Sequence, residues 1–193
     1  MTRVRFVGPI GGFSGAMEDM VFADHGEYTA AYMKRKRKGE PSEAQQSWNE
    51  RWDEAQAYAK WVKEDPAKWE FYKMVAKEKK KPVHALAVAD YLTKPSFDPL
   101  DLREYKGQVG NQIKIRAFDA VGLVSCEVAI FSVEGAEIER GMAVEMGTRS
   151  GFWLYTATQP VALGSDVFIE VVGVDYAGKR AKRTENPIVG EER

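Results

Sequence analysis

The sequence predicts an α+β fold, in which a β-hairpin and a three-helix segment precede an Ig-like antiparallel β-sandwich. The first observation is a change of period: apolar residues recur every three or four positions over 42–94 and every two positions from 111 onward. The second is the rhythm of the later apolar runs, which glycine-bearing turns separate at roughly ten-residue intervals. We therefore expect two domains, a hairpin and helical region over 1–95 and a sandwich with a short charged tail over 96–193.

Composition places the chain among folded globular proteins. Of its 193 residues, 44% are hydrophobic and 11% aromatic, which is enough to form a core. No apolar run approaches the roughly 18 residues of a membrane span, and the N-terminus lacks the apolar stretch of a secretory signal. We expect a cytoplasmic protein without a membrane partner. Release by a non-classical route, or residence in a particle, stays open.

The N-terminal arm is typical of short strands. Strand-like runs occupy 3–7, 19–24 and 27–33, and the dipeptide His25-Gly26 favours a turn between the last two. We expect a β-hairpin with its tip near 24–27. The glycines within 8–15 are expected to bend the first run tightly against the strand that begins near Asp19.

Three helices should follow, each with a recognisable start. Ser42 and Gln45 form a capping-box pattern at the first, Asp65-Pro66 restarts the chain as N-cap and first-turn proline, and Pro82 opens a third helix that ends before Pro95. The apolar face expected on the first helix comprises Ala44, Trp48, Trp52, Ala55, Ala59 and Val62. The second helix continues an apolar stripe through Trp69, Tyr72 and Ala76.

The C-terminal half alternates with the period of half-buried strands. The expected strands are 111–118, 123–131, 136–146, 151–158, 166–175 and 178–184. Their inward faces should include Ile113, Ile115, Ala117, Val124, Cys126, Val128 and Ile130. Strands of this number and spacing fit an immunoglobulin-like sandwich.

Three clusters of the sequence resemble a set of uncharacterised bacterial proteins. They are "FSGAMEDMVF" followed by "PSEAQ", then "AQAYAKWVKEDPAKWEFY" with "HALAVADYLTKP", and finally "LDLREYKGQVGNQIKIRAFDAVGLVSCEVAI". The resemblance implies an N-terminal hairpin and helices joined to a C-terminal Ig-like sheet module. It implies no activity.

The glycine-rich stretch around Ser14 does not match a catalytic or phosphate-binding motif. Residues 12–16 approximate the nucleophile elbow G-x-S-x-G, but that motif needs a helix after the serine, and the segment that follows is short and strand-like. The glycine spacing fits neither the P-loop nor the dinucleotide fingerprint. We therefore expect a conformational role for these glycines, no catalytic residues, no cofactor and no small-molecule substrate.

Histidine and cysteine are too few for a zinc site or a disulfide. Cys126 is the single cysteine, and only His25 and His84 could join it. Cys126 should be an inert core thiol. His84 and Asp90 are six positions apart and fall on different helical faces, so we expect a partly buried or capping histidine rather than a catalytic pair.

Calcium binding by the sandwich loops stays open. Carboxylates are expected at strand ends, but no D-x-D-x-D-G spacing concentrates them. The candidates are Asp98, Asp101, Asp119, Asp166 and Asp175.

Two surfaces are candidates for binding a macromolecule. The basic stretch Lys34, Arg35, Lys36, Arg37 and Lys38 could bind a polyanion, with Lys77 and Lys79 to Lys81 beside it if the helices fold back, or it could be a solvated strand end. The tryptophans of the helical region, Trp48, Trp52, Trp61 and Trp69, exceed what so small a helical segment can bury by itself.

From these features we expect a non-catalytic structural or interaction protein. Surplus aromatic surface and free strand edges favour association with itself or with another protein. A mild charge asymmetry agrees with self-association, since 1–95 carries 17 Lys and Arg against 14 Asp and Glu, and 96–193 carries 11 against 15. The alternative is a nucleic-acid-binding protein that uses the basic stretch and the helices.

Overall fold

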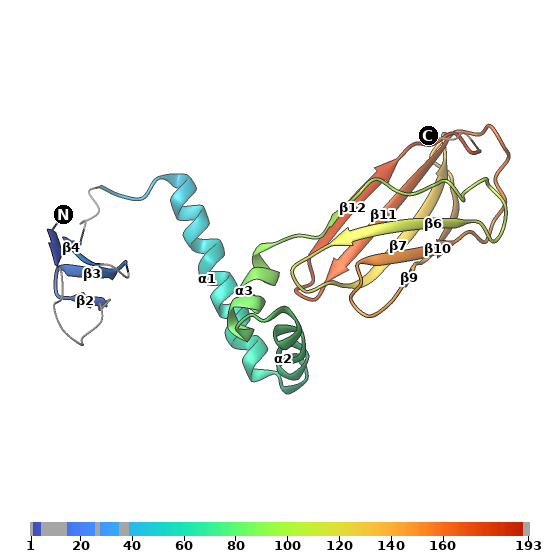
Figure 1. Ribbon diagram of the computed structural model, residues 1–193. Coiled ribbons are helices and arrows are strands. Elements are labelled where there is room, and N and C mark those ends of the chain that lie inside the picture. Colours follow the sequence, from blue (N-terminus) through green and yellow to red (C-terminus); the bar gives the residue numbers. More distant parts are fainter. Residues whose placement is uncertain (1, 5–14, 26–27, 35–38, 191–193) are drawn as a thin grey trace. The chain divides into compact units, whose positions relative to one another are not determined.

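The computed structural model describes residues 2–4, 15–25, 28–34 and 39–190. The chain divides into two compact units, Met1–Ala44 and Gln45–Arg193, which are described separately. The larger unit contains most of the three helices and the β-sandwich that follows them (Figure 1). This confirms the predicted α+β fold class.

The first unit is a four-stranded antiparallel sheet with the order β1-β4-β3-β2. Its strands are β1 (Thr2–Val4), β2 (Gly15–Met17), β3 (Met20–Asp24) and β4 (Thr29–Met33). The predicted hairpin is present, because β3 pairs with β4 from Met20↔Met33 to Asp24↔Thr29.

The pairing of the first strand differs from the expectation. β1 pairs with β4, and the neighbour of β3 on its other side is β2. The sequence Glu18-Asp19 makes this second hairpin, since Glu18 has a φ of 50° and Met17 pairs with Met20 across it. A positive φ at the first loop residue is typical of the tight turns that match strand twist. The glycine-rich turn expected over 8–14 lies outside the described residues.

The three predicted helices are present as α1 (Glu43–Glu64), α2 (Pro66–Lys79) and α3 (Val83–Leu92). Asp65 caps α2 as expected: its Oδ1 accepts hydrogen bonds from the backbone N–H of Ala67 at 3.0 Å and of Lys68 at 3.1 Å. α1 begins directly after Ser42, and α3 directly after Pro82.

The expected apolar face of α1 is buried in its second half only. Ala55, Ala59 and Val62 are buried, whereas Ala44, Trp48 and Trp52 are exposed. The buried half joins a helical core that also includes Tyr72, Val75, Ala76, Leu86, Ala87 and Val88. Packing against α2 and α3 thus begins near Ala55, which explains why the same helical period is buried at one end and exposed at the other.

The sandwich consists of two four-stranded antiparallel sheets, ordered β5-β6-β10-β9 and β12-β11-β7-β8. Its strands are β5 (Ser96–Phe97), β6 (Gln112–Phe118), β7 (Leu123–Ser132), β8 (Glu137–Met142), β9 (Val144–Glu145), β10 (Phe152–Thr156), β11 (Val167–Asp175) and β12 (Arg180–Glu185). The run expected as one strand over 136–146 divides at the buried residue Ala143, where the chain passes from one sheet to the other.

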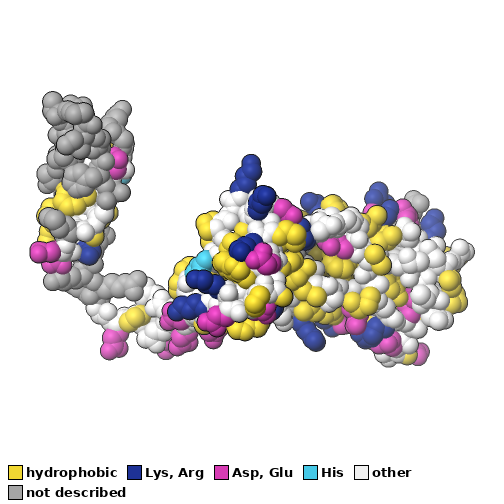
Figure 2. All heavy atoms as spheres, turned by 90° about the horizontal axis from the view of Figure 1, so that it is seen from below, with side chains coloured by type: hydrophobic (Ala, Val, Ile, Leu, Met, Phe, Trp, Pro, Cys, Tyr) yellow, Lys and Arg dark blue, Asp and Glu magenta, His cyan; other side chains and the backbone are white. Residues whose placement is uncertain are grey.

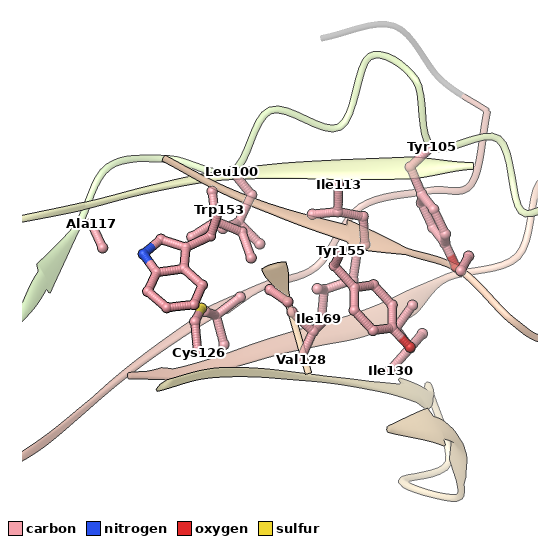
Figure 3. Packing of buried hydrophobic residues seen from close by; sticks show 14 of the residues in the cluster. Leu100, Tyr105, Ile113, Ala117, Cys126, Val128, Ile130, Trp153, Tyr155 and Ile169 are labelled. Carbon is pink, nitrogen blue, oxygen red and sulfur yellow. The ribbon is translucent and has the colours of Figure 1, made fainter. Parts of the chain in front are cut away.

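The sandwich core lies between the two sheets, where Ile113, Trp153, Tyr155 and Ile169 pack together (Figure 3). Ile115 belongs to the same core. The predicted inward residues Cys126, Val128 and Ile130 are also fully buried.

Val124 is an exception to that prediction, with 56% of its surface exposed. The register explains it: Val174 pairs with Ser125 and Asp175 with Leu123, so Val124 is the extra residue of a β-bulge. The bulge turns Leu123 inward instead.

The helices and the sandwich lie in one compact unit because sandwich residues enter the helical core. Val121 is buried among the helices, and the ring of Tyr176 stacks on Phe71 with centroids 4.1 Å apart. The domain boundary expected after residue 95 stays a prediction, since these contacts join the two regions without showing whether each folds alone.

Candidate interaction surfaces

The first half of α1 carries an uncovered aromatic surface. Every side chain from 43 to 54 is exposed, including Trp48 at 52% and Trp52 at 43%. The two rings are four residues apart and therefore lie on one face of the helix. The guanidinium of Arg51 lies 5.6 Å from the Trp48 ring centroid. We call Trp48 and Trp52 the α1 tryptophan pair.

The other two candidate tryptophans are not part of this surface. Trp61 is exposed at 47%, but nine residues at about 100° each place it on the opposite side of α1 from Trp52. Its ring contacts Lys68 on α2, whose Nζ lies 4.7 Å from the ring centroid. Trp69 on α2 is half-buried and packs against the helical core. The four tryptophans therefore form no single patch.

The strand edges of the sandwich differ in character. The edge strand β12 carries the cations Arg180, Lys182 and Arg183, which discourage pairing with another strand. At the opposite side of the sandwich, the edge strand β9 carries Val144, exposed at 70%, and is followed by the exposed Met146. In the view of Figure 2, hydrophobic side chains are visible on both the helical region and the sandwich.

The basic stretch is only partly within the described residues. Lys34 is exposed and follows β4, whereas residues 35–38 lie outside the described part of the chain. The lysines after Lys77 belong to the other compact unit. Two of them have structural roles, because Lys79 Nζ donates to the carbonyl oxygen of Ala120 and Lys80 closes α2 in the left-handed conformation.

The five candidate calcium ligands do not come together. Asp98 forms an ion pair with Arg116 at 3.5 Å. Asp101 forms one with Arg103 at 2.7 Å, and this interaction lowers the pKa of Asp101 to about 2. Asp166 is exposed, whereas Asp119 and Asp175 face the helices. Within the described residues, no group of three or more His, Cys, Asp or Glu side chains is arranged to hold a metal ion.

The candidate reactive side chains occupy structural or exposed positions. Cys126 is fully buried, and burial raises the pKa of its thiol to about 12. His84 is exposed on α3, which corrects the expectation of a partly buried or capping histidine. Asp90 is fully buried, in agreement with the prediction that the two residues lie on different faces. His25 lies beside Tyr28 near the hairpin tip, with ring centroids 5.0 Å apart.

A pocket of about 520 Å³ lies beside β6 and β10, lined in part by Asp98, Lys114 and Met146. Arg116, which also lines it, lies between two rings, 4.7 Å from the centroid of Phe118 and 5.4 Å from that of Phe152. Its lysine and arginine are already ion-paired, Lys114 with Glu104 and Arg116 with Asp98.

Sequence reasoning missed two buried carboxylates. Glu139 on β8 is 5% exposed, and its Oε2 accepts four hydrogen bonds from Tyr155, Thr158 and Gln159. Asp90 on α3 lies against two sandwich carboxylates and accepts a hydrogen bond from Tyr72. A signal for Asp90 was present, because it follows the buried residues Leu86 and Ala87 at helical spacings of four and three.

Comparison with known proteins supplies a weak fold likeness only. No family model matches the chain, and no curated protein does. Among solved structures, the crystal structure of CopC from Methylosinus trichosporium OB3b matches with a TM-score of 0.36 and 11% identity, over 48% of this chain and 89% of that chain. A likeness at this level carries no functional argument. The resemblance to uncharacterised bacterial proteins stays a prediction. In the described part of the chain, no helix is long and apolar enough to cross a membrane.

Proposed function

We propose that this chain is a non-catalytic structural protein that associates with other copies of itself. The observation that carries the proposal is the α1 tryptophan pair, two large rings on one face of a helix half that no other element of the larger unit covers. Trp is among the residues that contribute most when buried at a protein interface. A second copy would supply an equivalent helix face, which is the arrangement of a symmetric contact.

Two further features support association between copies. The β9 edge has the exposed Val144 and Met146 beside a single charged residue, Glu145, whereas β12 presents three cations. The chain also has an excess of cations in 1–95 and of anions in 96–193, which favours contacts between unlike parts of neighbouring copies.

The non-catalytic part of the proposal rests on the positions of the reactive side chains. The Cys126 thiol is fully buried and its pKa is raised to about 12, so it is protonated near neutral pH. His84 is exposed on α3, on a different face from the buried Asp90. Nucleophilic catalysis needs such groups within hydrogen-bonding reach of each other.

Sedimentation at several micromolar concentrations tests the proposal. We expect the mean mass of the wild-type protein to rise with concentration. The double variant Trp48→Ala/Trp52→Ala should weaken association by at least about 30-fold, the effect of losing about 2 kcal/mol at an interface hot spot.

The matched control is Trp61→Ala, which removes an equally exposed ring from the opposite side of the same helix. It should leave the concentration dependence unchanged. A wild-type protein that stays monomeric at every concentration and salt would overturn the proposal, and an equal loss in the control would remove α1 as the contact surface.

A further inference from the structure

The junction between the helices and the sandwich contains three carboxyl groups that face one another. Asp90 is on α3, Asp119 follows β6 and Asp175 ends β11. Asp90 is 0% exposed and Asp175 is 1% exposed. Buried acidic groups need donors for their oxygen atoms, because burial removes the water that would otherwise supply them.

In the described part of the chain, each of these groups has one oxygen with a donor and one without. Tyr72 Oη donates to Asp90 Oδ2, and Tyr58 Oη lies 2.9 Å from Tyr72 Oη. Asp119 Oδ2 accepts from the backbone N–H groups of Val121 at 2.9 Å and Gly122 at 3.1 Å.

Among the described residues, no donor reaches the second oxygen of any of these carboxyl groups, and each of these oxygens is buried. These atoms are Asp90 Oδ1, Asp119 Oδ1 and Asp175 Oδ2, while Asp175 Oδ1 accepts from the Lys179 backbone N–H at 2.7 Å. Asp119 lies at the same place, because Val121, whose N–H donates to Asp119, is buried in the helical core. Asp119 raises the pKa of Asp90 through its charge and through a side-chain hydrogen bond. Two ionised carboxylates cannot form that bond, since both are acceptors only.

We propose that Asp90 and Asp119 share one proton, and that this proton holds α3 against the sandwich. With the proton present, one carboxyl group donates to the other and both buried oxygens gain a partner. When it leaves, two negative charges remain side by side in a site with little solvent. The helix–sandwich junction is therefore a proton-dependent contact.

The surrounding groups favour the protonated form. The pKa of Asp90 is raised to about 7, mainly by burial; the Tyr72 hydrogen bond lowers it, and the charges of Asp119 and Asp175 add to the rise. Asp175 has a raised pKa as well, mainly from burial and only partly offset by the Lys179 backbone.

The other titratable groups that face Asp90 are two tyrosines and a lysine, none of which adds a negative charge near neutral pH. Burial raises the pKa of Tyr58 to about 12 and that of Tyr72 beyond the usual range, so both hydroxyls stay protonated near neutral pH. Lys179 is a nearby cation whose pKa is lowered, mainly by burial; the charges of Asp175 and Asp90 oppose this shift, and Arg51 and Lys94 add to it. Its Nζ lies 4.3 Å from the centroid of the Tyr91 ring.

The direction of the pH effect follows from the raised pKa. Between the ordinary pKa of an aspartate and the raised value in the fold, the folded chain binds more protons than the unfolded chain. The junction is therefore most stable at the acidic end of this window and weakens as pH rises toward neutrality. The equilibrium constant for opening should rise by at most about tenfold per pH unit.

The test is urea unfolding followed by the helical circular dichroism signal at several values between about pH 5 and about pH 8, with carbon NMR titration of the Asp90 carboxyl group. Asp90→Asn keeps an acceptor for Tyr72 and adds N–H donors toward Asp119 Oδ1. We expect the unfolding midpoint of this variant to fall much less with rising pH than the wild-type midpoint, with a small remaining slope from the raised pKa of Asp175. Asp119→Asn should also flatten the slope and lower the pKa of Asp90.

The matched control is Asp98→Asn, an exposed aspartate paired with Arg116. It should keep the wild-type slope. An unchanged slope in Asp119→Asn, or an Asp90 carboxyl carbon that titrates near the ordinary aspartate value, would overturn the proposal even if Asp90→Asn does not fold. Neither outcome bears on self-association, because the proton site and the α1 tryptophan pair are measured by different readouts.

Discussion

Glu139 and Asp90 are both buried acids, but their surroundings differ. Glu139 lies within the sandwich, and donors converge on its Oε2: Tyr155 Oη at 3.0 Å, Thr158 N and Oγ1 at 2.7 Å each, and Gln159 N at 3.2 Å. Asp90 lies at the junction, with one tyrosine as donor and two carboxyl groups as neighbours. The first site gives one carboxyl oxygen several donors, although Glu139 Oε1 is buried without one in the described part of the chain. The second site places two further carboxyl groups beside Asp90.

The difference shows how a buried acid can serve two purposes. Several donors to one carboxylate offset the loss of hydration, so Glu139 can fix the loop at 158–159 in place. Acidic neighbours make the ionised form costly, so Asp90 makes the fold respond to pH. Both carboxyl groups are buried polar groups beside apolar cores. The contribution of each to stability can be tested by removing one donor or acceptor at a time.

The largest effect is expected from Glu139→Ala. The change leaves two hydroxyl groups and two backbone N–H groups without their acceptor in a buried site. We expect the free energy of unfolding to fall by about 3 kcal/mol or more, in the range found when a buried charge network loses one member. Urea unfolding at neutral pH measures it.

Its control is Glu137→Ala on the same strand. Glu137 is exposed and paired with Arg140 at 2.7 Å, and surface ion pairs add little to stability. We expect almost no change in the unfolding midpoint. A loss as large as that of Glu139→Ala would mean that β8 tolerates no substitution, and the effect could then not be attributed to the buried carboxylate.

A smaller effect, dependent on pH, is expected from Tyr72→Phe. The phenol donates to Asp90 and lowers its pKa, so without it the ionised Asp90 loses its hydrogen-bond donor. The free energy of unfolding should fall by about 1 to 3 kcal/mol near pH 8 and by less near pH 5, where Asp90 is protonated in the fold.

Tyr105→Phe is the matched control, since Tyr105 is equally buried but its hydroxyl has no hydrogen-bond partner in the described part of the chain. Removing that hydroxyl should leave stability unchanged or slightly higher at both pH values. A pH-independent loss in Tyr72→Phe would indicate that the tyrosine acts through packing rather than through Asp90.

Most elements could be predicted because their signals are local. The Asp65-Pro66 start of α2 and the alternation of Ile113, Ile115 and Ala117 depend on neighbouring residues alone. The exposed Val124 could not be predicted, because its bulge is defined by pairing with β11. The surroundings of Asp90 depend likewise on two loops far along the chain, so the sequence indicates a buried acid on α3 but not what faces it.

The smallest effect is expected from Asp65→Ala, which extends the comparison to the surface. Asp65 accepts from two backbone N–H groups, as Glu139 does, but it is only half-buried at the start of α2, where water can replace a lost acceptor. The free energy of unfolding should fall by about 1 kcal/mol, and Asp65→Asn should keep most of it because the amide oxygen also caps helices well. Urea unfolding of both variants beside Glu139→Ala gives the measurement. If the free energy of unfolding fell equally in Asp65→Ala and Glu139→Ala, burial would not be what makes the loss of an acceptor costly.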